Sequence, residues 1–232
     1  MKKLNLFLVL LLSASLVFTG CDSLNNTAKG SIIGTGAGAA VGAGIGGLIG
    51  KDGKSAAVGA AIGGVVGATA GAIIGKKMDK AAAEAAAVEN AKVETIEDVN
   101  GLKAVKVTFE SGILFDFNKT ALKTDAKAAL TKFAKVLVEN PTMDIAVYGH
   151  TDNVGTLAAN QKVSLGRATT VADYLVAQGA TRTQMKVVEG RDYSMPVATN
   201  ETAEGRAQNR RVEVYMYASE KMIQDAQKEA SN

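Results

Sequence analysis

The stretch "MDIAVYGHTDNVGTLAANQKVSLGRATTVADYLVAQGA" (143–180) decides the fold that this sequence predicts. Apolar residues dominate 143–149, which favours a buried strand, and a polar loop follows it. Helical spacing of apolar residues then predicts a helix over 157–178, with Gly179 suited to its end. The positions of this helix expected to face the core are Leu165, Ala168, Ala172 and Leu175. Strand, loop and helix in this order are typical of an α/β protein.

Further elements are expected on both sides of this unit. Alternating residues predict a strand at 103–109, and a loop with buried aromatic residues follows at 111–120. A helix is expected at 121–139, and strands at 185–191 and 210–218. The core positions expected on that helix are Leu122, Ala126, Leu130, Phe133 and Leu137. The order β-α-β-α-β-β predicts the fold class α/β, as a two-layer sandwich with a mixed sheet.

Composition divides the 232 residues into unlike parts. Most of the 25 glycines fall between Gly30 and Gly75, and the net charge of +3 is too small to indicate a nucleic-acid partner. An alanine- and glutamate-rich run predicts a helix over 78–90, fading toward 100–101, as a solvated spacer. The expected parts are a signal peptide (1–20), a lipidated linker (21–29), a glycine-rich membrane hairpin (30–76), the helical spacer (77–101), the folded domain (102–218) and a tail that is a short polar helix or frayed (219–232).

The N-terminus has the pattern of a targeting segment. Lys2 and Lys3 precede an almost wholly apolar run at 4–18, and the sole cysteine, Cys21, follows at the expected cleavage point. The sequence "FTGC" (18–21) resembles a bacterial lipobox, which implies that Cys21 becomes the acylated N-terminus, carrying palmitate-type chains. The alternative is an ordinary signal peptide followed by a cysteine without function.

Two uncharged segments, 30–50 and 56–75, carry glycine at every fourth residue. Each has about 20 residues, which as a transmembrane helix would match a bilayer core. A glycine face lets two helices approach closely, so a membrane-embedded hairpin is expected, and homo-oligomers could form through it. The pattern resembles the glycine-zipper segments of bacterial outer-membrane lipoproteins. The alternative is a flexible glycine linker.

Three separated motifs carry a further resemblance. The stretches "FDFNKT" (115–120), "GHTDNVGTLAANQKVSLGRATTVADYLVAQGA" (149–180) and "NETAEGRAQNRRVEV" (200–214) together resemble the OmpA-like peptidoglycan-binding domain. The resemblance covers about 102–217, and with the lipobox and glycine zipper the chain resembles an outer-membrane lipoprotein of that family. One departure lies in "EGRDYSMP", where the family has a second glycine near Asp192.

The resemblance implies that the domain binds the diaminopimelate of peptidoglycan stem peptides. It places the ligand's ammonium on Asp152 and its carboxylate on Arg167, whose planar fork suits a carboxylate. Asn160, Ser164 and Arg167 are spaced i, i+4, i+7, so they share a helix face, expected where the core borders solvent. The alternative is that Asp152 and Arg167 only pair with each other.

Other residues around this pair are expected to assist. Asn160 is expected to support the loop and touch the ligand, while Thr151 and Gly155 shape the loop. Arg210 is expected near the ligand, and Asn209 is expected to tie the last strand to the loop. The full expected binding set is Asp152, Arg167, Asn160, Thr151 and Arg210.

The function expected is a non-catalytic, lipid-anchored tether that joins outer-membrane lipids to peptidoglycan, with the C-terminal domain in the periplasm. The alternative is a membrane assembly or pore of oligomerised hairpins that the wall domain only anchors. No nucleophile lies beside a base motif, and the single histidine, His150, reads as structural, so neither an enzyme nor a metal or other cofactor is expected. Asp22 would favour the inner membrane in some bacteria, yet the outer membrane is preferred.

Overall fold

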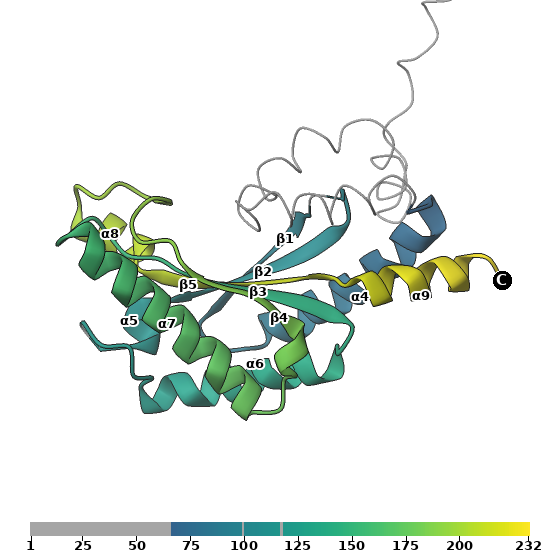
Figure 1. Cartoon of the computed structure of the whole chain (residues 1–232), viewed down its shortest axis with the longest axis horizontal. Helices are drawn as coiled ribbons and strands as arrows, with labels where there is room; N and C mark the ends of the chain where they lie inside the picture. Colours follow the sequence, from purple (N-terminus) through teal and green to yellow (C-terminus); the bar gives the residue numbers. More distant parts are fainter. Residues whose placement is uncertain (1–65, 99, 117) are drawn as a thin grey trace, which may run out of the picture.

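The computed structural model describes residues 66–98, 100–116 and 118–232, which form a five-stranded sheet with helices packed against it (Figure 1). The strands are β1 (Ala91–Glu97), β2 (Lys103–Glu110), β3 (Met143–Gly149), β4 (Met185–Gly190) and β5 (Arg211–Ala218). The helices are α4 (Ala68–Ala86), α5 (Ser111–Leu114), α6 (Thr124–Glu139), α7 (Leu157–Ala177), the 3-10 turn η2 (Arg182–Gln184), α8 (Ala203–Asn209) and α9 (Glu220–Ala230).

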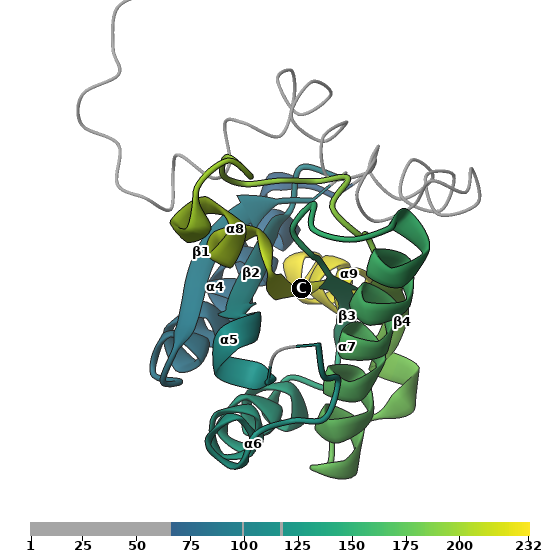
Figure 2. The ribbon, with the colours of Figure 1, turned by 90° about the vertical axis from the view of Figure 1, so that its left-hand side faces the viewer.

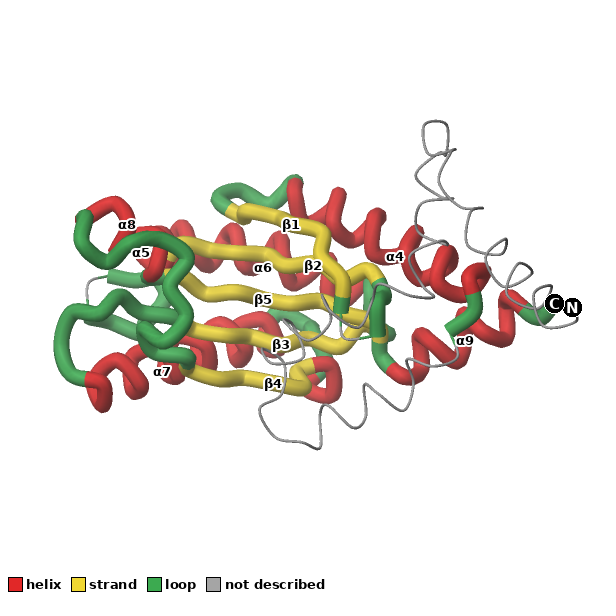
Figure 3. The backbone as a smooth tube through the Cα atoms, turned by 90° about the horizontal axis from the view of Figure 1, so that it is seen from above, coloured by secondary structure: helices red, strands yellow, loops and turns green. Residues whose placement is uncertain are grey.

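The sheet is mixed, with strand order β1-β2-β5-β3-β4. The neighbours β1 and β2, β2 and β5, and β5 and β3 are antiparallel. Strands β3 and β4 are parallel and are joined through α7. The tube view in Figure 3 shows the sheet with α4, α6 and α7 lying behind it. The expected β-α-β-α-β-β order is therefore confirmed, in β2, α6, β3, α7, β4 and β5. The loop expected at 111–120 contains the short helix α5.

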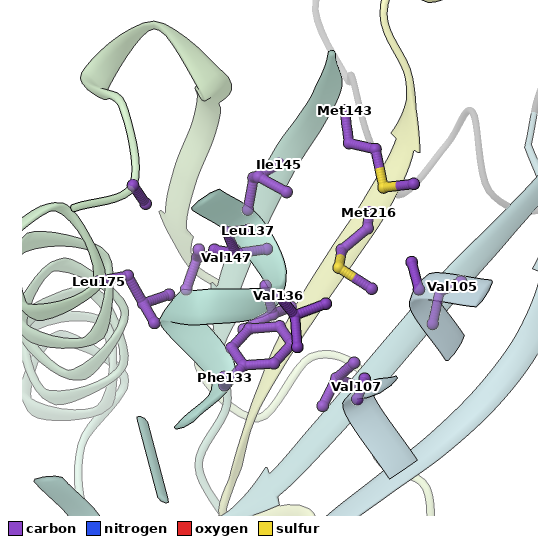
Figure 4. Close-up of a cluster of buried hydrophobic side chains, with 14 of the residues drawn as sticks. Val105, Val107, Phe133, Val136, Leu137, Met143, Ile145, Val147, Leu175 and Met216 are labelled. Carbon is purple, nitrogen blue, oxygen red and sulfur yellow. The ribbon is translucent and has the colours of Figure 1, made fainter. Parts of the chain in front are cut away.

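The core lies between the helices α6 and α7 and the face of the sheet that they cover (Figure 4). Inward side chains of β2, β3 and β5 meet α6, where the rings of Phe109 and Phe133 contact edge to face at 5.7 Å. The expected core positions are buried except for two: Leu122 is partly buried, and Leu165 is 48% exposed. The prediction for Leu165 was wrong, because α7 turns its buried face toward Ala168, Val171 and Leu175 instead.

The solvated spacer expected before the domain is also wrong. Residues 91–97 form β1, which pairs with β2 from Ala91 opposite Phe109 to Glu97 opposite Lys103. The buried residues of α4 recur at helical spacing and face β1 and β2: Ile74, Met78, Ala81 and Ala85. Small alanine side chains allow that close packing, and the alternation within "AKVETIE" suits a strand.

The C-terminal tail also belongs to the folded unit. Helix α9 buries Met222, Ile223 and Ala226, and it lies beside α4 at the right of Figure 1. Ser219 caps the helix by accepting a hydrogen bond from the Met222 backbone N–H at 3.1 Å. The two ends of the described chain therefore close the same part of the core.

The glycine-rich hairpin is only partly described. Cys21, the expected signal peptide and the first expected span lie outside the described residues. The end of the second expected span, 66–75, leads into α4, which runs without interruption to Ala86. Among the helices described, none combines the length and apolarity needed to cross a membrane.

Candidate ligand site at the end of the sheet

The site lies at one end of the sheet, toward the viewer in Figure 2, where α5, α8 and the start of α7 gather. The carboxyl ends of β2, β3 and β4 meet the start of β5 there. Gly149 pairs with both Gly190 and Val212, and Glu110 pairs with Arg211. Segments distant in sequence thus converge at this end.

Two glycines seat α7 directly on the strand ends. A Cβ atom on Gly149 would lie 2.0 Å from the Ser164 carbonyl oxygen, and one on Gly190 would lie 2.4 Å from the Leu165 nitrogen. Ser164 also accepts a hydrogen bond from the Asp192 backbone N–H at 3.1 Å. This contact fixes α7 relative to the loop that leaves β4.

Asp152 lies in the loop that leaves β3 and is 8% exposed. One carboxylate oxygen accepts the Val154 backbone N–H at 3.1 Å, and the other lies 2.5 Å from Nη1 of Arg210. The alternative that Asp152 pairs with Arg167 is therefore wrong, because the arginine that pairs with Asp152 is Arg210. The charge that neutralises Asp152 comes from Arg210, next to the start of β5.

The residues expected to shape this loop do so by direct contacts. Asn160 donates a hydrogen bond to the Val154 carbonyl at 3.0 Å, and the Thr151 backbone N–H donates to the Asp192 carbonyl at 2.8 Å. Gly155 has φ +93°, a backbone conformation that favours glycine. The Thr151 hydroxyl is buried without a hydrogen-bond partner among the residues that the structure describes.

Arg167 is 5% exposed and is held from two sides. Its Nε donates to the Lys119 carbonyl at 3.2 Å, and its guanidinium carbon lies 5.2 Å from the centre of the Phe115 ring. Within the described chain, no carboxylate forms an ion pair with it. Burial, followed by the charge of Arg210, lowers the pKa of Arg167, and Asp152 partly offsets this. The structure thus brings Asp152, Arg167 and Arg210 into one electrostatic group.

The helix face of Asn160, Ser164 and Arg167 is buried, not at the solvent border as expected. The expectation was wrong because it considered the residue spacing within one helix only. A separate loop segment, which carries Phe115 and Lys119, covers Arg167. Asp192, in the stretch "EGRDYSMP" where the resemblance departs, has φ +40° and accepts the Ser194 N–H at 2.7 Å. Aspartate tolerates this conformation better than most residues, so the turn is kept.

Asn209 fastens the 197–200 segment rather than the loop of Asp152. Its side-chain oxygen accepts the backbone N–H groups of Val197 and Ala198, and its nitrogen donates to the Ala198 carbonyl and to Asn200. Of Asn209 and Arg210, only Arg210 ties the last strand to the Asp152 loop. The Arg210 carbonyl also accepts the Ser111 N–H at 2.8 Å, which joins α5 to the site.

A cavity of about 340 Å³ adjoins Arg167 and Arg210. It is lined by Ser111, Gly112, Phe115, Asp116, Lys123, Arg167 and Arg210. Sequence reasoning assigned no role to Ser111, Phe115 or Lys123, although Phe115 lies in the quoted "FDFNKT" motif. No group of three or more histidine, cysteine, aspartate or glutamate residues suited to a metal ion occurs in the described part.

His150 lies behind the loop, 1% exposed, with Nε2 3.3 Å from a carboxylate oxygen of Glu213. Burial lowers the pKa of His150, against the opposing effect of Glu213. Burial would raise the pKa of Glu213, but the neighbouring His150 and the charge of Arg211 bring it below its usual range. His150 is therefore held neutral beside an ionised carboxylate.

This arrangement predicts a pH-dependent stability. The unfolded histidine titrates near pH 6.5, so below about pH 6.5 the unfolded chain binds a proton that the folded chain does not. We expect the free energy of unfolding to fall as pH drops from 7.5 to 5.5, by no more than about 1.4 kcal/mol per pH unit. Urea unfolding at several pH values would measure this.

The matched control for that prediction is His150→Gln, which removes the only histidine of the chain. The difference between the two pH profiles isolates its contribution from those of the carboxylates. Equal slopes for the two proteins in this pH range would contradict the prediction.

Comparison with known proteins places these features in a family context. Residues 114–210 match the OmpA family, and residues 1–79 match the YMGG-like Gly-zipper family. The first match contains Asp152, Arg167 and Arg210 together.

Individual proteins are similar over the same region. Outer membrane protein A of Bordetella avium is 40% identical over 118 residues, covering 51% of this chain and 60% of that protein. Outer-membrane lipoprotein YfiB of Pseudomonas aeruginosa is 38% identical over 108 residues, covering 47% of this chain and 64% of that protein. The chain thus spans less than two thirds of either relative. The solved structure of the cell wall anchor of the T6SS from Pseudomonas aeruginosa has a TM-score of 0.51 at 32% identity, covering 61% of this chain and 97% of that one.

Proposed function

The chain carries an OmpA-family domain at 114–210, and from this premise we propose that it is a non-catalytic, lipid-anchored tether joining the outer membrane to peptidoglycan. The observation that carries the proposal is the buried guanidinium of Arg167, which lacks a carboxylate partner among the described residues and lies near the Asp152–Arg210 pair. A buried charge without a partner is costly, so such a site favours a ligand that supplies the missing carboxylate.

The proposed ligand is the free end of diaminopimelate in a stem peptide, which carries an ammonium and a carboxylate on one carbon. Asp152 takes the ammonium, and Arg167 takes the carboxylate through paired hydrogen bonds. The Nε of Arg167 already donates to the Lys119 carbonyl, so its outer nitrogens are the ones available to the ligand. Asn160 and Thr151 hold the loop that presents Asp152.

Arg210 gives this site a closed form before ligand binds. It neutralises Asp152, and its side chain is 36% exposed, so it has room to move. The ligand ammonium competes for the same carboxylate oxygen. Arg210 then shares Asp152 or turns toward the ligand carboxylate beside Arg167. In either case Asp152 stays paired throughout binding.

The membrane end of the tether rests on the N-terminal features. Acylation of Cys21 supplies the anchor, and an outer-membrane location agrees with the name of the lipoprotein relative YfiB. The glycine zipper at 30–76, within the family match at 1–79, adds a surface for packing in or against the membrane. Because α4 packs on the domain from Ala70 onward, the glycine-rich segment leads directly into the wall-binding unit.

Fractionation of the full chain tests this tether. The wild-type chain is expected in the outer-membrane fraction and, after detergent extraction, to sediment with purified sacculi. Cys21→Ser, which cannot be acylated, is expected to leave the outer-membrane fraction but to keep sedimenting with sacculi. A Cys21→Ser chain that stays in the outer-membrane fraction would instead favour the oligomeric membrane assembly, which the hairpins hold in the membrane without the lipid.

A further inference from the structure

The cavity beside Arg167 carries more positive charge than the proposed ligand end can balance. Two charged pairs cancel at its border: Asp116 lies 3.1 Å from Lys119, and Asp152 pairs with Arg210. Arg167 and Lys123 also line the cavity, and neither forms an ion pair with a carboxylate of the described residues. The end of diaminopimelate is a zwitterion without net charge, so its binding leaves this surplus of two cations unchanged.

A second observation comes from Ser111, which also lines the cavity. Its side chain is 2% exposed, and its hydroxyl has no hydrogen-bond partner in the described chain. Buried hydroxyls are nearly always partnered, so an orphan one at a cavity wall indicates a missing ligand group. The position of Ser111 is fixed, because its backbone N–H donates to the Arg210 carbonyl at 2.8 Å.

The cavity also extends away from Asp152. Asp152 is not among its lining residues, whereas Arg167 and Arg210 both are. Lys123 donates to the Gly112 carbonyl at 3.2 Å, which places its ammonium beside α5. A volume of about 340 Å³ leaves room for more than one small polar group.

We propose that this cavity is a second anion subsite, which takes a further carboxylate of the same wall peptide on Lys123 and the Ser111 hydroxyl, beside Arg167. The proposal rests on the proposed function, since Arg167 and Asp152 must first hold the diaminopimelate end. In the stem peptide, the glutamate before diaminopimelate is joined through its side-chain carboxyl, so its α-carboxylate is free. That group is the one chemically suited to the cavity.

The test compares two synthetic peptides that differ in one charge: γ-D-glutamyl-diaminopimelate and its α-amide. Calorimetry with the full chain in detergent is expected to show about tenfold tighter binding of the acid form, because a charge-assisted hydrogen bond is lost in the amide. The Lys123→Met, Ser111→Ala double variant is expected to bind both peptides as the wild type binds the amide. Lys127→Met, which removes a lysine outside the cavity lining, is expected to keep the tenfold preference.

The outcomes separate this proposal from the one on which it rests. Equal binding of acid and amide by the wild type would overturn the second subsite while leaving the tether in place. A preference for the acid form that survives in the double variant would overturn the assignment to Lys123 and Ser111. Binding of neither peptide would overturn the diaminopimelate site itself, and the second subsite with it.

Discussion

Alanine at both Asp152 and Arg167 is expected to weaken binding to peptidoglycan sacculi by at least about tenfold, while the protein stays folded. Each substitution leaves one charged group of the ligand without its partner. Such truncations cost about 2–5 kcal/mol where a charge pair is well desolvated, and less where water reaches the site. Both side chains are buried, which favours a cost above the lower end of this range. Sedimentation of the full chain with sacculi, and calorimetry with free diaminopimelate, would measure the loss.

A matched control removes the same two residue types elsewhere. Arg182 and Asp173 form an ion pair at 2.9 Å in which both side chains are more than half exposed. Their double alanine variant is expected to bind sacculi as the wild type does, because exposed pairs contribute only about 0–1 kcal/mol to stability. Arg167→Lys is expected to restore little, since an ammonium cannot form the paired contact. Binding near the wild-type level by a folded Asp152→Ala, Arg167→Ala chain would reject the clamp.

The sequence was sufficient for the parts of this site that recur as motifs. Asp152 and Arg167 lie in one strand–loop–helix stretch, whose period predicted β3 and α7 and whose spacing placed Asn160, Ser164 and Arg167 on one face. The order of elements from β2 to β5 followed from the same periodicity. Local patterns of this kind depend on residues a few positions apart.

Long-range packing was beyond the same reasoning. Arg210 lies 58 positions from Asp152, and no local spacing links an arginine at the start of β5 to an aspartate after β3. The burial of Arg167 depends on a separate loop that carries Phe115 and Lys119. The resemblance placed Arg167 and Arg210 in one binding set, but their contacts with Asp152, Lys119 and Phe115 could be found only in the folded chain.

The same limit explains the errors at the ends of the domain. An alanine-rich run predicts a helix whether or not a partner covers it, so α4 was read as solvated. Its partners are β1, β2 and α9. The three buried apolar residues of α9 are too few to indicate a buried helix without α4 beside them. Strand β1 was missed because the helical composition before it was extended too far. A soluble fragment limited to 102–217 would thus lack β1, α4 and α9.

Gly149→Ala is expected to destabilise the folded chain by about 3 kcal/mol or more. The added methyl group would lie 2.0 Å from the Ser164 carbonyl oxygen, and a backbone atom cannot move aside as a side chain does. The strand end and α7 must therefore separate, which loosens the packing of Ala168 and Val171 on the sheet. The free energy of urea unfolding would measure the effect.

Gly112→Ala is the control, because a Cβ atom there would meet nothing within 4 Å and alanine suits a helix better than glycine. If Gly149→Ala and Gly112→Ala have the same free energy of unfolding, the close approach of α7 to β3 is wrong.

The Gly149→Ala variant and the double alanine variant of Asp152 and Arg167 also differ in how stability and binding change together. Asp152 follows Gly149 by three residues, and Arg167 follows Ser164 by three, so Gly149→Ala should weaken wall binding only by displacing the clamp. Its loss of binding should therefore accompany a loss of stability, whereas the Asp152→Ala, Arg167→Ala chain should lose binding alone.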